Sequence, residues 1–351
     1  MGKRILTNKF NLPKTLVQAV ALDTHRVSGT ISVTTLIDSP QIRMLKSKHD
    51  YEVDVSEGIY ALMGTALHSV LERGNMPSVR QRAFILTAET LAEKAKEYAE
   101  AYPDKASQLN NGSSWLFSLV QAFFPETEQT LIFEKMLQLD CGDHIISGTF
   151  DLYDKETGIL YDYKFCSTFN YVYPEGMKKW EEQTNIYAYM LRMNGYHVNG
   201  IRIVAFFRDW SEQRLMSTRG YPERQIMEIP ISLKSDGEVK SAIDWHLNRH
   251  RASEAGDPVE CDGRDRWATS DVYAVMKTDK SGKVGKRAEK LHVSHVEAQY
   301  WIDENKHKYL DTKLVIQRRP GESRRCAKYC PVNKFCAQYK EEQERKAMQG
   351  E

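Results

Sequence analysis

The chain has 351 residues, of which 41% are hydrophobic and 28% charged, and its formal net charge is +1. This composition supports a real hydrophobic core, in one large domain or in a domain with a sizeable insertion. No segment approaches the roughly 18 uninterrupted apolar residues of a membrane span, and the N-terminus has no signal-peptide core, so we expect a cytoplasmic protein with no membrane partner. The small net charge argues only weakly against nucleic-acid binding, because positive charge can gather in one groove.

The first third of the chain is expected to be mainly helical. Residues 1–28 carry little signal and are interpreted as a lead-in segment. A short extended piece from Ile31 leads into a helix near Pro40, since proline is tolerated in a first helical turn. Further helices are expected over residues 83–101 and 115–124.

Residues 58–73 give a stronger helical pattern, because their apolar side chains recur at helical spacing. His68 and Glu72 lie four residues apart in this segment and therefore share one face. Taken alone, the pair indicates a structural histidine capped by a carboxylate.

Residues 146–164 predict a β-hairpin around which the rest of the chain is organised. Two apolar runs flank a polar turn at residues 154–158. Strand alternation puts Asp162 and Lys164 on one face of the second strand and Tyr163 on the other.

If the two strands pair, Asp151 and Asp162 converge beside Lys164. Burying two carboxylates with one ammonium is costly unless a divalent cation and an anionic substrate complete the charge balance. Metal-assisted phosphodiester hydrolysis requires this combination. A strand expected at residues 131–136 places Glu134 near the same sheet. The alternative is a solvated surface hairpin with no chemical role.

The segments after the hairpin complete a mixed sheet. A helix expected over residues 178–193 carries Gln183 and Tyr187 one turn apart on one face. Residues 201–207 are a buried strand, and residues 236–252 are helical. This order predicts an α/β (α+β) protein with a central mixed sheet flanked by helices.

The composition changes beyond Cys261. A second hairpin from residues 272–277 and 288–293, a helix over 294–306 and a strand at 313–317 predict a small strand-strand-helix-strand insertion. Its many lysines make it a candidate DNA-contacting module, although a solvated surface explains them equally well.

Three of the six cysteines form a C-terminal group. Cys326, Cys330 and Cys336 have the close spacing of metal or cluster ligands, which is uncommon in a chain this poor in cysteine. Cys141 and Cys166 lie near the predicted hairpin and are interpreted as packed thiols. Three unligated thiols remain the alternative for the C-terminal group.

Four short motifs occur in an order that resembles the PD-(D/E)XK nuclease superfamily, specifically its RecB-like exonuclease branch. The chain is similar there to the CRISPR-associated iron–sulfur exonucleases and to phage recombination exonucleases. The matching text is Gly64-Thr65-Ala66-Leu67-His68, Gly148-Thr149-Phe150-Asp151, Asp162-Tyr163-Lys164 and Gln183-Thr184-Asn185-Ile186-Tyr187.

The resemblance implies a PD-(D/E)XK core with a divalent-metal site. The ligands of Mg²⁺ or Mn²⁺ would be His68, Asp151, Asp162 and the backbone carbonyl of Tyr163. Lys164 would act on the attacking water, and Gln183 and Tyr187 would support the site and touch DNA. Glu134 is a weaker acidic candidate. Carboxylate oxygens suit magnesium, and one imidazole biases such a site toward manganese.

The C-terminal cysteines resemble the triad of the iron–sulfur exonucleases, which usually draw a fourth cysteine from just before a proline near the N-terminus. Here Ser39 precedes Pro40. Cys261 is the nearest alternative, and its ligation would close residues 262–325 into a loop. We expect a [4Fe-4S] cluster held by Cys261, Cys326, Cys330 and Cys336, with Zn²⁺ as the alternative.

These interpretations divide the chain into a lead-in (1–28), a nuclease core (29–255), a small basic module (256–320) and a cysteine segment with a C-terminal helix (321–351). The expected function is metal-dependent exonucleolytic hydrolysis of DNA in recombination, repair or phage DNA processing. The expected partners are DNA ends or single strands and a single-strand annealing or recombination protein. The alternatives are a catalytically silent DNA-binding subunit and an endonuclease of the same superfamily. The sequence has no Gly-x4-Gly-Lys-Ser/Thr loop, so we expect no ATP-driven motor in this chain.

Overall fold

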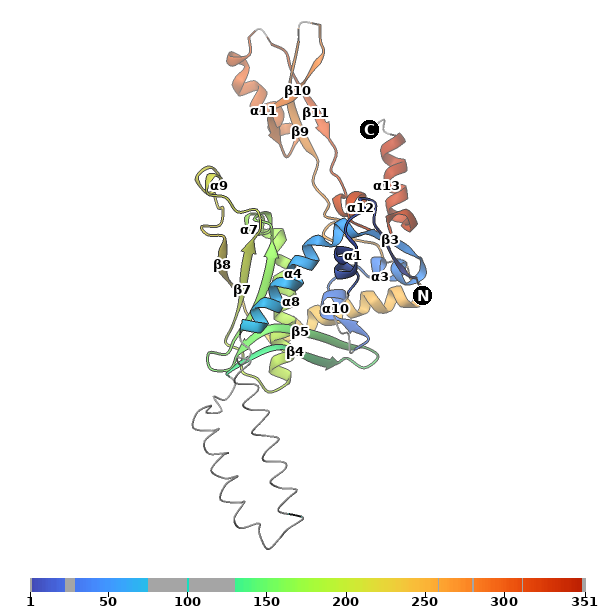
Figure 1. Ribbon diagram of the computed structural model, residues 1–351. Helices are drawn as coiled ribbons and strands as arrows, with labels where there is room; N and C mark the ends of the chain where they lie inside the picture. The colour runs from blue at the N-terminus through green and yellow to red at the C-terminus, as the bar shows by residue number, and fades with distance from the viewer. Residues whose placement is uncertain are drawn as a thin grey trace. The chain divides into compact units, whose positions relative to one another are not determined.

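The computed structural model describes residues 2–22, 29–74, 100, 130–257, 259–279, 281–310 and 312–348. The helices expected over 83–101 and 115–124 lie outside these residues, apart from Glu100, which is helical. The chain forms two compact units that alternate along the sequence (Figure 1). The sheet unit contains Asn8–Ile37 and Val55–Asp244, and the cysteine unit contains Met1–Thr7, Asp38–Asp54 and Trp245–Glu351. No helix in the described ranges is both long enough and apolar enough to cross a membrane.

A mixed sheet of six described strands forms the centre of the sheet unit. Their bounds are β2 (Ile31–Ser32), β4 (Leu131–Asp140), β5 (Ile145–Asp154), β6 (Ile159–Cys166), β7 (Gly200–Phe207) and β8 (Ile226–Ile231). The order is β2-β5-β6-β7-β8, and β4 pairs with β5. The β2–β5 and β6–β7 pairs are parallel, and the other pairs are antiparallel. The predicted mixed α/β architecture is confirmed.

The predicted hairpin is β5 and β6, and the pairing along β5 changes partner midway. Leu152 pairs with Tyr161 of β6, whereas Ile146 pairs with Ile31 of β2. Residues 148–151, which end in the predicted aspartate, lie between these two pairings. On this side of β5, no described strand pairs with residues 148–151, and Asp151 lies at the end of this unpaired stretch.

Helices pack on the sheet and enclose the core. Their bounds are α1 (Lys14–Ala21), α2 (Val33–Leu36), α4 (Ile59–Gly74, after the 3-10 turn Val55–Gly58), α7 (Phe169–Val172), α8 (Pro174–Met193) and α9 (Glu212–Ser217). α8 packs against β4, β5, β6 and β7, while α4 packs against β6. The largest fully buried side chains of this core are Phe150, Tyr153, Phe207, Ile31, Leu36, Ile146, Leu160, Ile186, Met190, Leu191, Ile201 and Ile203.

Two segments differ from the sequence expectation. Residues 33–36 form α2 rather than extended chain, because the Ser32 hydroxyl accepts a hydrogen bond from the Thr35 N–H at 3.2 Å and caps the helix. Residues 169–172, which precede the expected helix at 178–193, form the helical turn α7. The next helix then begins at Pro174, earlier than predicted, since proline suits a first helical turn.

The cysteine unit consists of short elements and one long helix. Their bounds are β1 (Arg4–Thr7), α3 (Pro40–Lys48), β3 (Tyr51–Asp54), α10 (Asp236–Ala255, which begins in the sheet unit), α12 (Arg324–Lys328), the 3-10 turn Asn333–Phe335 and α13 (Ala337–Met348). The expected lead-in is not featureless, because β1 pairs in parallel with β3 from Arg4 opposite Tyr51 to Thr7 opposite Asp54.

The predicted strand-strand-helix-strand insertion is present within the cysteine unit. It contains β9 (Val272–Thr278), β10 (Val284–His292), α11 (His295–Asn305), the 3-10 turn Lys306–Lys308 and β11 (Leu314–Arg319). The antiparallel strands lie in the order β10-β9-β11, and α11 packs against all three. We call residues 272–319 the basic module.

Candidate active site and cysteine site

His68 reaches the unpaired stretch of β5 from α4. Its Nδ1 lies 3.4 Å from Glu134 Oε1 and 3.4 Å from Asp151 Oδ1, and its Nε2 lies 3.2 Å from the Tyr163 carbonyl oxygen. Among the described residues, the side chains of His68, Glu134 and Asp151 form the one group of possible metal ligands whose donor atoms all lie within 4.8 Å of one another. The carboxylates beside His68 thus come from β4 and β5 rather than from Glu72, its helical neighbour.

The two carboxylates hold a proton on the imidazole. Hydrogen bonds to Asp151 and Glu134 raise the pKa of His68 to about 10, against the opposing effect of burial. Positive charge is therefore strongly favoured at this point. A divalent cation between the same three side chains would satisfy the carboxylates in place of the proton, so the donor set fits a metal ion.

Glu134 has an unusual backbone conformation. The residues on either side of it pair with β5 in one register, which places Glu134 opposite Asp151. Its φ is +45°, in the left-handed region that glutamate seldom adopts. Such strain costs on the order of 1–3 kcal/mol and gathers at functional sites. A single sequence carries no signal of such strain, and Glu134 was only a weaker candidate in the sequence analysis.

Asp151 connects the imidazole to the backbone of β6. One of its oxygens, Oδ1, faces His68, and the other accepts a hydrogen bond from the Tyr163 N–H at 2.6 Å. The side chain thus spans the part of the sheet where β5 and β6 no longer pair, and it fixes the orientation of the Tyr163 peptide.

Asp162 and Lys164 lie on one face of β6, as the alternation predicts. Lys164 Nζ is 2.6 Å from Asp162 Oδ2, and the two side chains are 20% and 3% exposed. Burial raises the pKa of Asp162 to about 6, with Asp151 adding to the effect and Lys164 opposing it. Burial also works against the charged ammonium, but Asp162 and Asp151 outweigh it and raise the pKa of Lys164. The buried pair faces an excess of carboxylate, which again favours a cation.

Two side chains of α8 extend this network. Lys164 Nζ donates to Gln183 Oε1 at 3.1 Å, and Gln183 Nε2 donates to the Tyr187 hydroxyl at 3.1 Å. Burial raises the pKa of Tyr187, so its hydroxyl stays neutral. The Tyr187 ring lies against Gly148, where an added Cβ would be 2.5 Å from Tyr187 Cε1. Only glycine allows this approach.

The predicted residues of this site lie in two groups of contacts, one around His68 and one around Lys164, which adjoin at Asp162 and Tyr163 of β6. The residues are His68, Glu134, Asp151, Asp162, Tyr163, Lys164, Gln183 and Tyr187. The sequence named Asp162 as a metal ligand with His68, and Glu134 only as a weaker candidate. In the structure, Glu134 lies beside His68, and Asp162 is paired with Lys164.

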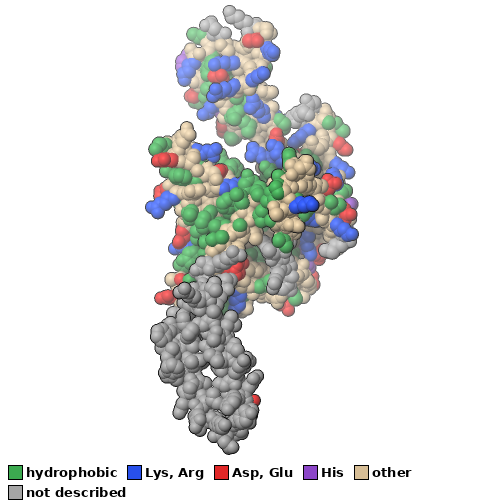
Figure 2. Space-filling view, viewed as in Figure 1, with side chains coloured by type: hydrophobic (Ala, Val, Ile, Leu, Met, Phe, Trp, Pro, Cys, Tyr) green, Lys and Arg blue, Asp and Glu red, His purple; other side chains and the backbone are tan. Residues whose placement is uncertain are grey.

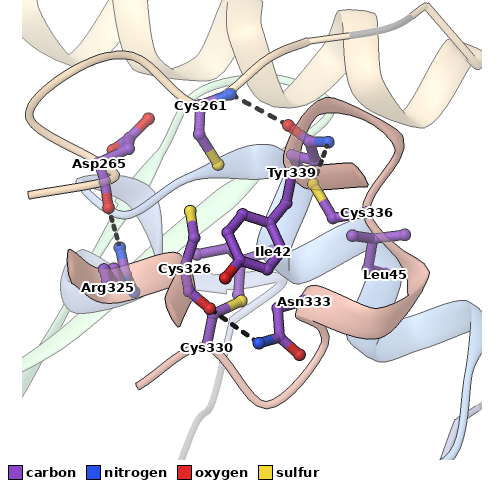
Figure 3. Close-up of a pocket in the computed structure, with 11 residues that line it drawn as sticks. Ile42, Leu45, Cys261, Asp265, Arg325, Cys326, Cys330, Asn333, Cys336 and Tyr339 are labelled. Atoms are coloured by element: carbon purple, nitrogen blue, oxygen red, sulfur yellow. Dashed lines mark hydrogen bonds between the residues drawn. The ribbon is translucent and has the colours of Figure 1, made fainter. Parts of the chain in front are cut away.

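The four cysteines singled out by the sequence line one pocket of the cysteine unit. Cys261 follows α10, Cys326 lies in α12, and Cys330 and Cys336 flank the turn before α13. Figure 3 shows their sulfurs pointing toward one another across the pocket. All four are free thiols, and the described residues contain no three of these sulfurs within 4.8 Å of one another.

Polar groups donate hydrogen bonds to these sulfurs or lie in position to do so. Gln41 Nε2 donates to Cys336 Sγ at 3.3 Å, and its Oε1 accepts from the Cys261 N–H at 3.0 Å. Ser39 Oγ lies 3.0 Å from Cys261 Sγ, so the serine that stands before Pro40 touches the proposed substitute ligand directly. Such contacts are typical of thiolates that hold a metal centre.

Burial and neighbouring charges act in opposite directions on the thiols of this pocket. Burial raises the pKa of Cys261 to about 12 and that of Cys326 to about 11. Two cations lie close by, since Arg325 and Lys46 both act on Cys330 and lower the cost of its thiolate. Arg325 is itself paired with the Asp38 carboxylate at 2.7 Å, so the donor set fits a metal centre because four thiols line one pocket, and not because of spare positive charge.

Comparison with models of protein families identifies the family to which the chain belongs. The model of the PD-(D/E)XK nuclease superfamily matches residues 43–337. The match covers most of the sequence, including Asp151, Asp162 and Lys164. The chain therefore belongs to the PD-(D/E)XK nuclease superfamily, whose members are nucleases that use divalent metal ions.

Other comparisons found only distant likeness. A search of curated proteins found no match. The solved structure of SSO0001 is 14% identical, with 67% of this chain and 84% of that chain covered and a TM-score of 0.34. A phage-related exonuclease from Haemophilus somnus 129PT is 12% identical, with 51% and 82% covered and a TM-score of 0.24. Both TM-scores are below 0.5, so the family assignment rests on the family match.

Proposed function

We propose that this nuclease is a metal-dependent DNA exonuclease, a hydrolase that removes nucleotides from DNA ends. The observation that carries the proposal is the cation-seeking group of His68, Glu134 and Asp151 beside the buried Asp162–Lys164 pair. The ordered motifs that resemble the RecB-like branch favour an exonuclease within the superfamily. DNA recombination, repair or phage DNA processing is the setting this branch suggests.

The residues divide the work of hydrolysis between them. His68, Asp151 and Asp162 with the Tyr163 carbonyl would hold Mg²⁺ or Mn²⁺, and Glu134 joins this set. When bound, such an ion lowers the pKa of water and offsets charge on the phosphate. Lys164 orients the attacking water and stabilises negative charge that develops in the transition state.

Gln183 and Tyr187 act on Lys164 from α8. Gln183 accepts one hydrogen bond from the ammonium and so limits the directions in which its remaining protons point. Tyr187 in turn holds the Gln183 amide. Of the two, Gln183 is the better placed to touch DNA, because it is half-buried while Tyr187 is only 4% exposed and supports the site from the interior.

The second part of the proposal is a [4Fe-4S] cluster held by Cys261, Cys326, Cys330 and Cys336. Four thiolates around a single zinc ion at about 2.3 Å would have sulfurs about 3.8 Å apart. The wider spread of these sulfurs supports the larger cluster, and zinc is the alternative outcome. Its role is structural, because hydrolysis of a phosphodiester transfers no electrons.

End-labelled linear DNA and closed circular DNA, each incubated with Mg²⁺ or Mn²⁺ and with a chelator, test the nuclease proposal. We expect metal-dependent loss of the linear substrate and survival of the circle. Cleavage of both would identify an endonuclease. Binding without cleavage under every metal condition would identify the silent DNA-binding subunit.

A further inference from the structure

The basic module carries positive charge that the rest of the chain lacks. Residues 272–319 contain eleven Lys and Arg against six Asp and Glu, a net charge of +5. The whole chain has a net charge of +1, so all other residues together sum to −4. Figure 2 shows Lys and Arg side chains over the visible face of the module. The concentration is local, which the overall composition conceals.

The module's carboxylates are already engaged inside it. Each of the five that the structure describes has a partner there. They are Asp279 with the Ser281 hydroxyl, Glu289 with Lys277, Glu297 with His292, Asp303 with Lys306 and Glu304 with the Tyr300 hydroxyl. Two of these carboxylates, Glu289 and Asp303, are paired with lysines of the module, and the net charge of +5 remains after all six acidic residues are counted.

Four exposed cations follow one edge of the module's sheet. They are Lys283, Lys286, Arg287 and Lys290, which precede or lie on the edge strand β10. In the described part of the chain, no carboxylate forms an ion pair with any of the four. The register of β10 against β9 shifts between Val284 and Ala288 and again before Lys290. Such bulges turn neighbouring side chains away from strict alternation.

We infer that β10 and the turn before it form a nucleic-acid contact surface that binds the phosphate backbone. The inference rests on the proposed function, since it assigns a second contact to the same DNA substrate. Residues 283–291 contain no aromatic side chain, so this surface offers phosphate contacts and no platform for base stacking. Its binding is therefore independent of sequence and sensitive to salt.

The base of the module is fastened to the segment that carries the cysteines. Thr269 N–H donates to the Glu322 carbonyl at 3.0 Å, and Ala268 pairs with Ser323. The Glu342 carboxylate of α13 accepts from the Ser323 hydroxyl at 2.7 Å. An added Cβ at Gly321 would lie 1.9 Å from the Thr269 oxygen, so the two chains run in close contact. These contacts hold the two ends of the basic module together and fasten them to α13, in the segment that carries Cys326, Cys330 and Cys336.

The edge strand has a competing explanation. Exposed edge strands often carry lysines because charge prevents pairing with a second copy. That role needs charge on the strand but predicts no affinity for nucleic acid. The test therefore measures DNA binding and oligomeric state on the same proteins.

The test variant is Lys283→Gln, Lys286→Gln, Arg287→Gln and Lys290→Gln combined, in a full-length Asp162→Asn background that stops cleavage. The matched control removes three exposed lysines and one arginine elsewhere, by Lys155→Gln, Lys240→Gln, Lys340→Gln and Arg345→Gln. Fluorescence anisotropy with labelled duplex and single-stranded DNA, from 50 to 200 mM salt, gives the affinity and its salt slope. Circular dichroism and size-exclusion chromatography check folding and oligomeric state.

We expect the four-site variant to bind more weakly, with the slope of log K against log salt reduced by about 3.6 on duplex or about 2.8 on single strands. On duplex, the parent would then lose about 150-fold more affinity than the variant across this salt range. The arm that shows the larger loss identifies the form of DNA bound. The control should keep its slope, and replacing the three lysines by arginine should preserve binding.

Two results would overturn the inference. The first is an unchanged slope in the four-site variant, or an equal fall in the control. The second is self-association without loss of DNA affinity, which would support the edge-protection role. If the wild-type chain cleaves DNA while the four-site variant in the Asp162→Asn background binds DNA normally, this surface alone is refuted. Absence of both DNA binding and DNA cleavage in the wild-type chain would instead refute the proposed function.

Discussion

The candidate active site and the cysteine site are positioned by different kinds of structure. In the sheet unit, Asp151, Asp162 and Lys164 lie on paired strands whose register sets which side chains meet. In the cysteine unit, the four thiols come from loops, a five-residue helix and a turn, with no strand pairing between them. The first site can keep its shape without a metal ion, whereas the second depends on side-chain packing that a metal centre would reinforce.

This contrast predicts different consequences of losing a ligand. Removing a group from the sheet site should impair chemistry while the fold persists. Removing a thiol from the cysteine site should impair the local fold, because the hydrophobic cluster there is small and Cys261 is one of its three buried members, with Ile42 and Val332.

Lys164→Ala and Asp162→Ala should each lower DNA cleavage by orders of magnitude. These groups act mainly on the transition state, so their loss appears in turnover rather than in DNA binding. Steady-state cleavage of labelled linear DNA, with binding measured separately, checks the expectation. Lys155→Ala in the turn between β5 and β6 is the matched control and should retain full activity. Near-normal turnover by purified Lys164→Ala would refute the assignment.

Cys261→Ser should abolish the metal centre and leave the chain protease-sensitive after residue 255. Anaerobically purified parent protein should absorb near roughly 400 nm and contain about four irons per chain. The variant should lose both signals, while Cys141→Ser should keep them. If the parent protein were colourless and held one zinc ion, the metal would be zinc rather than iron, and the four cysteine ligands would stay as proposed.

The contact between Ser39 and Cys261 allows a sharper version of this experiment. The two side-chain atoms are 3.0 Å apart, so a thiol at position 39 would start close to the position that Cys261 Sγ occupies. Ser39→Cys combined with Cys261→Ser should therefore restore iron content and protease resistance. Full iron content and protease resistance in Cys261→Ser alone would show that Cys261 is a packed thiol.

Loss of a residue that only hydrogen-bonds to a metal ligand lowers metal affinity about 10- to 100-fold. His68→Ala removes a proposed ligand itself, so it should weaken Mn²⁺ binding by at least this factor. Activity should recover in part at high Mn²⁺, because the carboxylates of Glu134 and Asp151 remain. Calorimetric titration of both proteins measures the affinity directly. Glu72→Ala is the matched control, since Glu72 lies on the same helix face but not beside the imidazole. An unchanged affinity with a lower melting temperature would leave His68 only a structural role.

The sequence predicted the parts of the fold that local patterns determine. The hairpin, the His68 helix and the Gln183–Tyr187 spacing follow from periodicity within one element. It could not predict the strained backbone of Glu134 or the contact of Ser39 with Cys261. That contact joins residues 222 positions apart, and it depends on how α3 and the loop after α10 pack. Distances between side chains on separate elements are set by packing, for which one sequence carries no direct signal.

The smallest effect we predict concerns Gly148, which supports the site without touching substrate. Gly148→Ala places a Cβ 2.5 Å from Tyr187 Cε1 and 2.8 Å from Val33 Cγ2, so the ring must move. Such overpacking should destabilise the protein by about 1–3 kcal/mol. Displacing Tyr187 should also loosen Gln183 and lower turnover with little change in DNA affinity. Gly200→Ala is the matched control, because an added Cβ there meets nothing within 4 Å. Thermal unfolding and cleavage rates of both variants separate the two effects. If Gly148→Ala lost stability but kept full turnover, Tyr187 would be a packing residue, and the network behind Lys164 would end at Gln183.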